Sequence, residues 1–249
     1  MDPQRHVVWF SCGAASAALS KMVVGTVPHD RLAVVYCDTS RNEHPDNGRF
    51  LRDVERWTGF PVTVLSSEKY RTVEEVFEAR RYMSGVRGAP CTVELKKKVR
   101  FAFQRADDIH YFGYTADERV GRRETFESNN PDLLLRWPLI EAGVTKAGCL
   151  QMLRDAGIPV PVMYGLGYKN NNCIGCVKAT SMSYWRRIRR DFPDVFARRV
   201  TQSRDIGARL LQMKGKRSFL DELPPETALP ALTKVLEDVS CGPECRGEA

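Results

Sequence analysis

Cysteines with metal-ligand spacing are the residues of this sequence best suited to chemistry. Cys173 and Cys176 form a C-x-x-C pair in "NNCIGC", and Cys241 and Cys245 form a C-x-x-x-C pair near the end of the chain. Two thiolates three residues apart in a glycine-containing loop can grip one metal centre. The spacing therefore predicts a metal site, and zinc held by these four thiolates is one form of it. Unligated or redox-active thiols are the alternative.

A second stretch, "VVWFSCGAAS" at residues 7–16, is typical of an anion-binding turn. An apolar run ends at Ser11 and a helical pattern follows Gly13, so backbone N–H groups gather at a helix N-terminus, which favours phosphate. We expect Ser11, Gly13, Ala14 and Ser16 to contact it. The Gly-Lys-Ser/Thr of a Walker loop is absent. An ordinary strand-to-helix turn is the alternative.

Cys12 lies inside this turn and is a candidate catalytic thiol as well as part of the phosphate-binding set. A position at the positive end of a helix would lower its pKa. The alternative is a small residue that the turn tolerates. Valine in place of Gly13 is expected to block the approach of backbone to ligand.

Charged residues follow two further predicted strands. Asp38 is a candidate for catalysis and for binding ribose hydroxyls or Mg²⁺, and Thr39 would support it. For Glu43 and Asp117, helix capping is the alternative to a role in the site. Arginines after the fourth strand could clamp phosphates in a bidentate manner or form a solvated helix face; they are Arg119, Arg122 and Arg123.

The elements that must position these residues alternate between strand and helix patterns. Strands are predicted at 6–10, 31–38, 61–67, 109–115 and 132–139, with helices at 16–24, 44–59, 72–82 and 92–106. This order predicts an α/β fold, a parallel twisted sheet with helices on both faces. Ligands bind such sheets at the carboxyl ends of the strands, here just after residues 10, 38 and 115. Residues 1–140 would form this core, and 141–249 a helical, cysteine-bearing extension with a helix at 145–159 and a helical stretch broken near Pro193.

Composition limits the class of protein. The chain has 249 residues, a net charge of +7 and no run of 18 apolar residues, so no membrane-spanning helix is expected. No signal peptide is evident, and we expect a cytoplasmic protein whose eight cysteines are not a disulfide framework. The basic helix around "RRIRR" (186–190) could track a nucleic-acid backbone or serve as a docking surface.

Four segments together resemble the adenine nucleotide α-hydrolase superfamily. "SCGAAS" resembles its PP-loop, "YCDTSRNEHPDN" (36–47) its second-strand motif, and "GYTADERVGRRETF" (113–126), which begins at Gly113, its Gly-x-x-x-x-Glu/Asp segment. "WPLIEAGVTKAGCLQMLRDAGIPVPVMYGLGYKNNNCIGC" (137–176) resembles PAPS reductase-like proteins. Two positions depart from the pattern: Cys12 replaces the first loop glycine, and Ala15 replaces an acidic residue common in ATP pyrophosphatases.

This resemblance implies an adenine nucleotide (ATP, APS or PAPS) as ligand, with Gly113 in its site. It also implies a [4Fe–4S] cluster on Cys91, Cys173 and Cys176, with Cys241 or Cys245 as a fourth ligand or with an open iron; zinc is the alternative. PAPS reductases carry a C-terminal Glu-Cys-Gly-Leu-His, of which Cys241-Gly242 remains, so Cys241 is a candidate catalytic thiol.

The functions implied are sulfur transfer or nucleotide activation, with APS/PAPS reduction as one alternative. A non-catalytic nucleotide- or nucleic-acid-binding module with a structural zinc is the other. The expected partners are a tRNA or DNA acceptor and a sulfur-donor protein, with an oligomer possible and no membrane.

Overall fold

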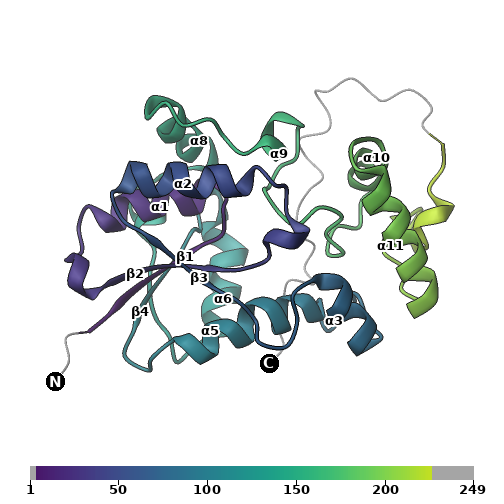
Figure 1. The fold of residues 1–249 in the computed structure, drawn as a ribbon, viewed down its shortest axis with the longest axis horizontal. Coiled ribbons are helices and arrows are strands. Elements are labelled where there is room, and N and C mark those ends of the chain that lie inside the picture. The colour runs from purple at the N-terminus through teal and green to yellow at the C-terminus, as the bar shows by residue number, and fades with distance from the viewer. Residues whose placement is uncertain (1–3, 226–249) are drawn as a thin grey trace.

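A five-stranded parallel sheet forms the centre of the protein in the computed structural model, which describes residues 4–225 (Figure 1). β1 is central because its run of apolar side chains is buried on both faces, as a strand covered by helices on either side requires. In spatial order the strands are β3 (Val62–Leu65), β2 (Leu32–Cys37), β1 (His6–Phe10), β4 (Ile109–Phe112) and β5 (Leu134–Arg136).

Helices cover both faces of the sheet (Figure 1). Val8 and Phe10 of β1 belong to a core that includes residues of three helices, α1 (Ala14–Val24), α2 (Asn47–Thr58) and α8 (Lys146–Asp155). Val7 and Trp9 point to the opposite face, where Phe103 of α5 (Lys98–Phe103) packs. The predicted α/β fold, with a parallel sheet and helices on both faces, is confirmed.

A second hydrophobic core lies beside the sheet and is built from residues 70–95 and 163–223. It buries the loop that carries Cys173 and Cys176, called the cysteine loop or C-x-x-C loop below, against α10 (Met182–Asp191). Trp185 of α10 is fully enclosed. The elements around it are α3 (Val73–Arg80), α4 (Pro90–Thr92), the π-helical turn η3 (Val93–Lys97), α9 (Val162–Gly165), α11 (Pro193–Ile206), β6 (Leu211–Met213) and β7 (Lys216–Ser218). The division of the chain at residue 140 stays a prediction.

The short connecting elements complete the description. Three 3₁₀ turns flank the sheet and a fourth follows β7: η1 (His29–Arg31), η2 (Ser40–Asn42), η4 (Ala116–Glu118) and η6 (Leu220–Glu222). After β4 come η5 (Arg119–Arg123), α6 (Glu124–Ser128) and, beyond β5, α7 (Pro138–Glu141). No helix in the described part of the chain has the length and apolar character needed to cross a membrane.

Two elements differ from the sequence-based expectation. The predicted helix at 92–106 is divided into α4, η3 and α5, because i→i+5 hydrogen bonds replace the α-helical pattern over Val93–Lys97. The antiparallel hairpin β6–β7 was not predicted. Its turn uses Lys214 and Gly215, both at positive φ, which is the two-residue hairpin geometry that a Lys-Gly pair can supply.

Candidate nucleotide-binding site

The turn between β1 and α1 is organised around the side chain of Ser16. Its Oγ accepts hydrogen bonds from the Ser11 amide at 3.1 Å, the Ser11 hydroxyl at 3.3 Å and the Gly13 amide at 3.3 Å. It donates to the Gly13 carbonyl at 2.9 Å. The Ala14 amide, at the start of α1, donates to the Tyr164 hydroxyl at 3.2 Å. The predicted turn therefore forms, with both serines on one spot at a helix N-terminus.

Cys12 is the strained residue of this turn. Its φ is 54°, in the left-handed region that favours glycine, and its side chain is 1% exposed. Burial raises the pKa of its thiol and the nearby Glu43 raises it further, the reverse of the lowering expected at a helix N-terminus. Cys12 is thus enclosed and its pKa is raised, not lowered as expected, and its catalytic role stays a prediction.

The two glycines of the site have different roles. Gly13 lies in extended backbone at φ −103°, and an added Cβ would meet the Tyr164 hydroxyl only at an ordinary 3.5 Å. At Gly113, which follows β4, an added Cβ would lie 3.0 Å from the Ser16 amide nitrogen. Close backbone approach therefore requires glycine at position 113, where β4 meets the first turn of α1, and not at position 13.

Asp38 follows β2 at the same edge of the sheet. Its Oδ1 accepts from the Ser40 hydroxyl at 2.6 Å and the Ser40 amide at 3.0 Å, and its Oδ2 accepts from Ser66 at 3.3 Å. Burial acts to raise the pKa of this carboxyl, but the hydrogen bonds from Ser40 and Ser66 outweigh it and the net pKa is lowered. A half-buried, ionised carboxylate at a strand end suits ribose hydroxyls or a cation.

Glu43 is the centre of a buried polar network beneath the turn. The Thr39 hydroxyl donates to it at 2.5 Å, the Tyr36 hydroxyl at 2.8 Å and the Asn47 amide at 2.7 Å. Thr39 is 2% exposed and Glu43 is 6% exposed. Thr39 therefore acts through Glu43 and not through Asp38, and Glu43 anchors the segment between β2 and α2 rather than capping a helix.

The predicted arginine clamp is already engaged with acidic side chains. Arg122 pairs with Glu118 and lies over the Tyr114 ring, and Arg123 pairs with Glu127 at 3.4 Å. Arg119 begins η5, and only its backbone is described. Arg122 and Arg123 follow the correct strand, but they contact protein groups in this structure.

Three of the cysteines share one neighbourhood. Cys91, Cys173 and Cys176 are half-buried and interact electrostatically with one another and with Lys96. Burial raises the pKa of Cys91 to about 11 and of Cys173 to about 12. For Lys96, desolvation acts to lower the pKa, but Cys173 and Glu43 outweigh it and the net pKa is raised. Lys96 is thus a cation that interacts with both Glu43 and the thiols.

A metal centre does not follow from this arrangement as it stands. Within residues 4–225, no group of three or more His, Cys, Asp or Glu side chains is placed to hold a metal ion. All six cysteines of that part are free thiols. The other predicted ligands, Cys241 and Cys245, lie outside the described residues, and the metal centre stays a prediction.

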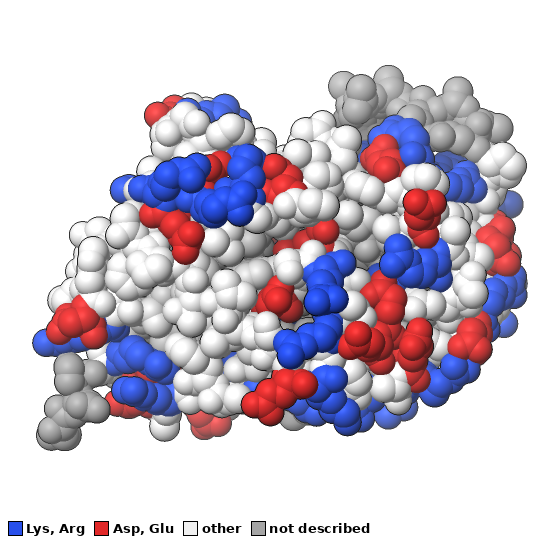
Figure 2. All heavy atoms as spheres, in the orientation of Figure 1, with Lys and Arg blue, Asp and Glu red and all other residues white. Residues whose placement is uncertain are grey.

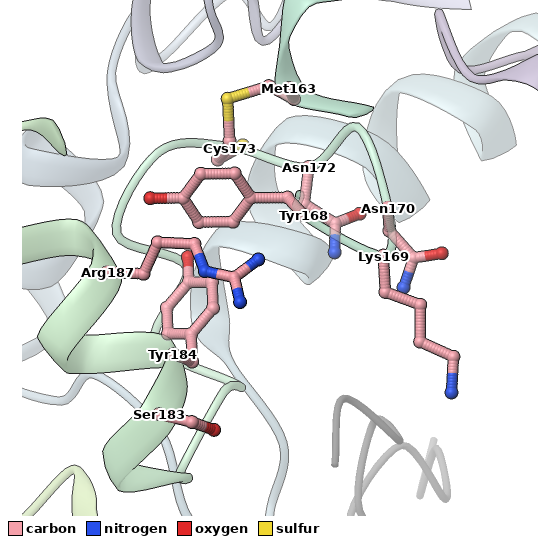
Figure 3. A pocket seen from close by; sticks show the side chains of 9 residues that line it. All are labelled: Met163, Tyr168, Lys169, Asn170, Asn172, Cys173, Ser183, Tyr184 and Arg187. Atoms are coloured by element: carbon pink, nitrogen blue, oxygen red, sulfur yellow. The ribbon is translucent and has the colours of Figure 1, made fainter. Parts of the chain in front are cut away.

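A small cavity opens beside Cys173, between the loop that precedes it and α10 (Figure 3). Its lining contains two cations, Lys169 and Arg187, and no acidic side chain. Arg187 is engaged, because it donates to the Gly167 carbonyl and stacks over the Tyr168 ring at 5.3 Å. The remaining lining residues are Met163, Asn170, Asn172, Ser183 and Tyr184.

Several arginines of the basic helix α10 make contacts within the protein. Besides Arg187, Arg189 donates to the carbonyls of Leu223 and Pro224, and Arg190 pairs with Asp191 at 2.7 Å. Figure 2 shows basic and acidic side chains interspersed over one face of the molecule. On that face the positive net charge does not form a continuous basic track.

Several residues that build the site carried little signal in the sequence. Tyr164 and Asn171 reach the turn from α9 and the cysteine loop, and Asn47 of α2 contacts Asn171. The triple asparagine before Cys173 was the only local hint of a polar anchor in that loop. Spacing cannot place such residues, because they lie more than 30 positions from the turn and meet it only in three dimensions.

Comparison with known proteins gives a likeness to solved structures and none to a sequence family. No family model and no curated protein matches the sequence. A solved structure that resembles the chain is phosphoadenylyl-sulfate (PAPS) reductase from Candida auris in a phosphate complex, with a TM-score of 0.49 and 14% identity. The alignment covers 69% of this chain and 82% of that chain. The parallel sheet of this protein, with the Ser11–Ser16 turn after β1, has the α/β architecture expected from the sequence.

Proposed function

We propose that this PAPS reductase-like protein binds an adenine nucleotide and acts in sulfur transfer or nucleotide activation. The observation that carries the proposal is the convergence of Ser11 and Ser16 at the N-terminus of α1, at the carboxyl edge of a parallel sheet. The first-turn amides of an α-helix have no partners inside the helix and favour an anion. The phosphates would lie on this turn.

The surrounding residues supply recognition and charge. Asp38 is ionised and would orient ribose hydroxyls or Mg²⁺, and Gly113 lets β4 approach the turn closely. Lys96 lies between Glu43 and Cys173 and would neutralise anionic charge that extends from the turn toward the cysteines. Cys12 has no nucleophilic part in this scheme, because it is buried and protonated.

Titration calorimetry with ATP, APS and PAPS tests the binding step. Ser16→Ala removes the oxygen that organises the turn and should weaken nucleotide binding by about tenfold, the effect of losing a little over one kcal/mol. Ser20→Ala is the matched control: the Ser20 hydroxyl bonds to the Ser16 carbonyl one helical turn further on. Equal affinity in wild type, Ser16→Ala and the control, or no binding to wild type, would refute the site.

Product analysis separates the candidate reactions. Release of AMP and pyrophosphate from ATP indicates nucleotide activation, and sulfite release from APS or PAPS with a thiol reductant indicates sulfonucleotide reduction. Reduction would be expected to need Cys241. Binding without turnover of any of these nucleotides leaves the non-catalytic module.

The metal content of the protein decides whether a metal centre belongs to the proposed function. Iron, sulfide and zinc are assayed in protein purified without oxygen, in wild type and in Cys91→Ser, Cys173→Ser, Cys176→Ser, Cys241→Ser and Cys245→Ser variants. About four irons per chain, lost in the first three variants, would support a [4Fe–4S] cluster. One zinc per chain would support the zinc alternative, and metal-free protein would leave the thiols unligated.

A further inference from the structure

Asn171 is a buried residue of the cysteine loop. Its side chain reaches the turn at residues 11–16, the proposed phosphate-binding turn, which is called the phosphate turn below. It is 6% exposed, and its Nδ2 donates to the Cys12 carbonyl at 2.6 Å and to Asn47 Oδ1 at 2.8 Å. Since a carbonyl oxygen only accepts, the nitrogen of the amide must face Cys12. The bond joins residues 159 positions apart.

The partner of this hydrogen bond is the strained residue of the turn. Cys12 has a φ of 54°, a conformation that costs a side-chain-bearing residue free energy and persists only where surrounding contacts impose it. Asn171 donates a hydrogen bond to the backbone carbonyl of Cys12, and the Ser16 hydroxyl accepts one from the amide of the next residue, Gly13. Asn171 is thus one of the contacts that impose the conformation.

The loop that carries Asn171 also contains the cysteines and is hydrogen-bonded elsewhere. Asn171 is two residues before Cys173, and the Ile174 amide donates to the Asn42 carbonyl at 2.8 Å, which binds the same loop to the segment after β2. Asn47 continues the connection to Glu43 at 2.7 Å. The turn, the segment after β2 and the C-x-x-C loop are therefore joined in one hydrogen-bonded network.

We propose that Asn171 is a positioning residue that holds Cys12 in its left-handed conformation and couples occupancy of the phosphate turn to the order of the C-x-x-C loop. The coupling rests on the proposed function, because it requires an anion on the turn. It is reciprocal: a ligand that orders the turn orders the loop, and loosening the loop weakens the ligand.

Hydrogen exchange measured by mass spectrometry tests the Asn171–Cys12 hydrogen bond without a ligand. Asn171→Ala should raise exchange several-fold in peptides covering both 11–16 and 172–177, because one lost anchor frees both segments. Asn172→Ala, a matched change at an exposed neighbour, should leave the turn peptide unchanged. Asn171→Leu, which keeps the branched shape at Cγ but has no hydrogen-bond donor, replaces the alanine variant if that variant does not fold. Unchanged exchange in the turn would overturn the proposal.

Rescue by glycine tests the strain. In Cys12→Gly the left-handed conformation has no steric cost, so adding Asn171→Ala to it should reduce nucleotide affinity far less than the roughly fivefold to tenfold expected in the wild-type background. The loop peptide should still exchange faster in the double variant. An equal loss of affinity in both backgrounds would show that Asn171 acts only through general stability.

Nucleotide addition tests the coupling. ATP should slow exchange of the 172–177 peptide in the wild type and have little effect on it in the Asn171→Ala variant at matched occupancy. Protection of the loop in both proteins overturns the coupling. If wild type does not bind nucleotide in calorimetry, the proposed function fails, and the ligand-free and glycine-background exchange measurements still decide the role of Asn171.

Discussion

The phosphate turn and the C-x-x-C loop are neighbours, yet they are held by different forces. Serine hydroxyls and backbone groups hold the turn, and most of these groups belong to residues 11–16. Asn171 and Tyr164 add hydrogen bonds from elsewhere in the chain. A buried guanidinium holds the loop: Arg199 is 1% exposed, donates to the Gly175 carbonyl at 3.2 Å and pairs with Glu74 at 2.7 Å. One region is built by local sequence and the other by tertiary packing.

The difference shows which site is preformed. In the turn, donors already surround one spot and the nearby Asp38 has a lowered pKa, so it is ionised at neutral pH. In the loop, burial keeps Cys91 and Cys173 protonated, and the described residues do not complete a ligand set. The turn is thus ordered by its own hydrogen bonds before any ligand binds, whereas a metal on the thiols stays a prediction.

Arg199→Met should have the largest effect on stability. It leaves the Glu74 carboxylate without its buried partner and the Gly175 carbonyl without its donor, which should lower the free energy of unfolding by about 3–5 kcal/mol. Urea denaturation measures the loss. Arg198→Met, at the exposed neighbouring position, is the control. If both variants lose the same amount, the loop is not held by Arg199.

Glu43→Leu tests the network beneath the turn. The change strips the partner from the Tyr36 and Thr39 hydroxyls and from the Asn47 amide, and should cost about 2–4 kcal/mol. Nucleotide affinity should also fall, since Asn47 supports Asn171. Glu78→Leu, on the exposed side of α3, should change stability by well under half of that. Wild-type affinity in a folded Glu43→Leu protein would separate the network from the site.

The two glycines give a smaller and more specific contrast. Gly113→Ala places a Cβ against the backbone of α1 and should cost about 2 kcal/mol, with loss of nucleotide binding. Gly13→Ala should cost about 0.5–1 kcal/mol, as expected for an N-cap change without a clash. Denaturation and calorimetry on both variants measure the order, and the reverse order would contradict the close approach at Gly113.

Asp38 gives the smallest effect, visible only as a pH dependence. Its pKa is lowered in the folded state, so its contribution is complete above the ordinary aspartate value and is lost as pH falls from about 4 through the lower folded pKa. The loss should be under about 1 kcal/mol, because the group is partly exposed. Unfolding free energy measured from pH 5 to pH 2.5 should fall less in Asp38→Asn than in the wild type. Parallel curves would show that the carboxylate is not stabilised.

Much of the fold could be predicted from short-range patterns. Strands β1 to β5 and most helices follow from short apolar runs and 3.6-residue periodicity, and the strand-turn-helix of residues 6–24 forms where the sequence predicts it. The β6–β7 hairpin and the break at Val93–Lys97 were missed, since three-residue strands and an i→i+5 turn have no distinctive hydrophobic period. Gly113 lies where β4 approaches α1 closely, and its part in nucleotide binding stays a prediction.

The sequence by itself determined the alternation of strands and helices and the position of the turn after β1, because both depend on residues that are close together in the chain. Only the tertiary structure decided that Cys12 is buried, that Lys96 lies among the thiols, and that Asn171 joins the cysteine loop to the turn. The physical reason is that solvation and hydrogen bonding depend on neighbours in space. A thiol at a helix N-terminus has a lowered pKa in water and a raised one when the chain encloses it.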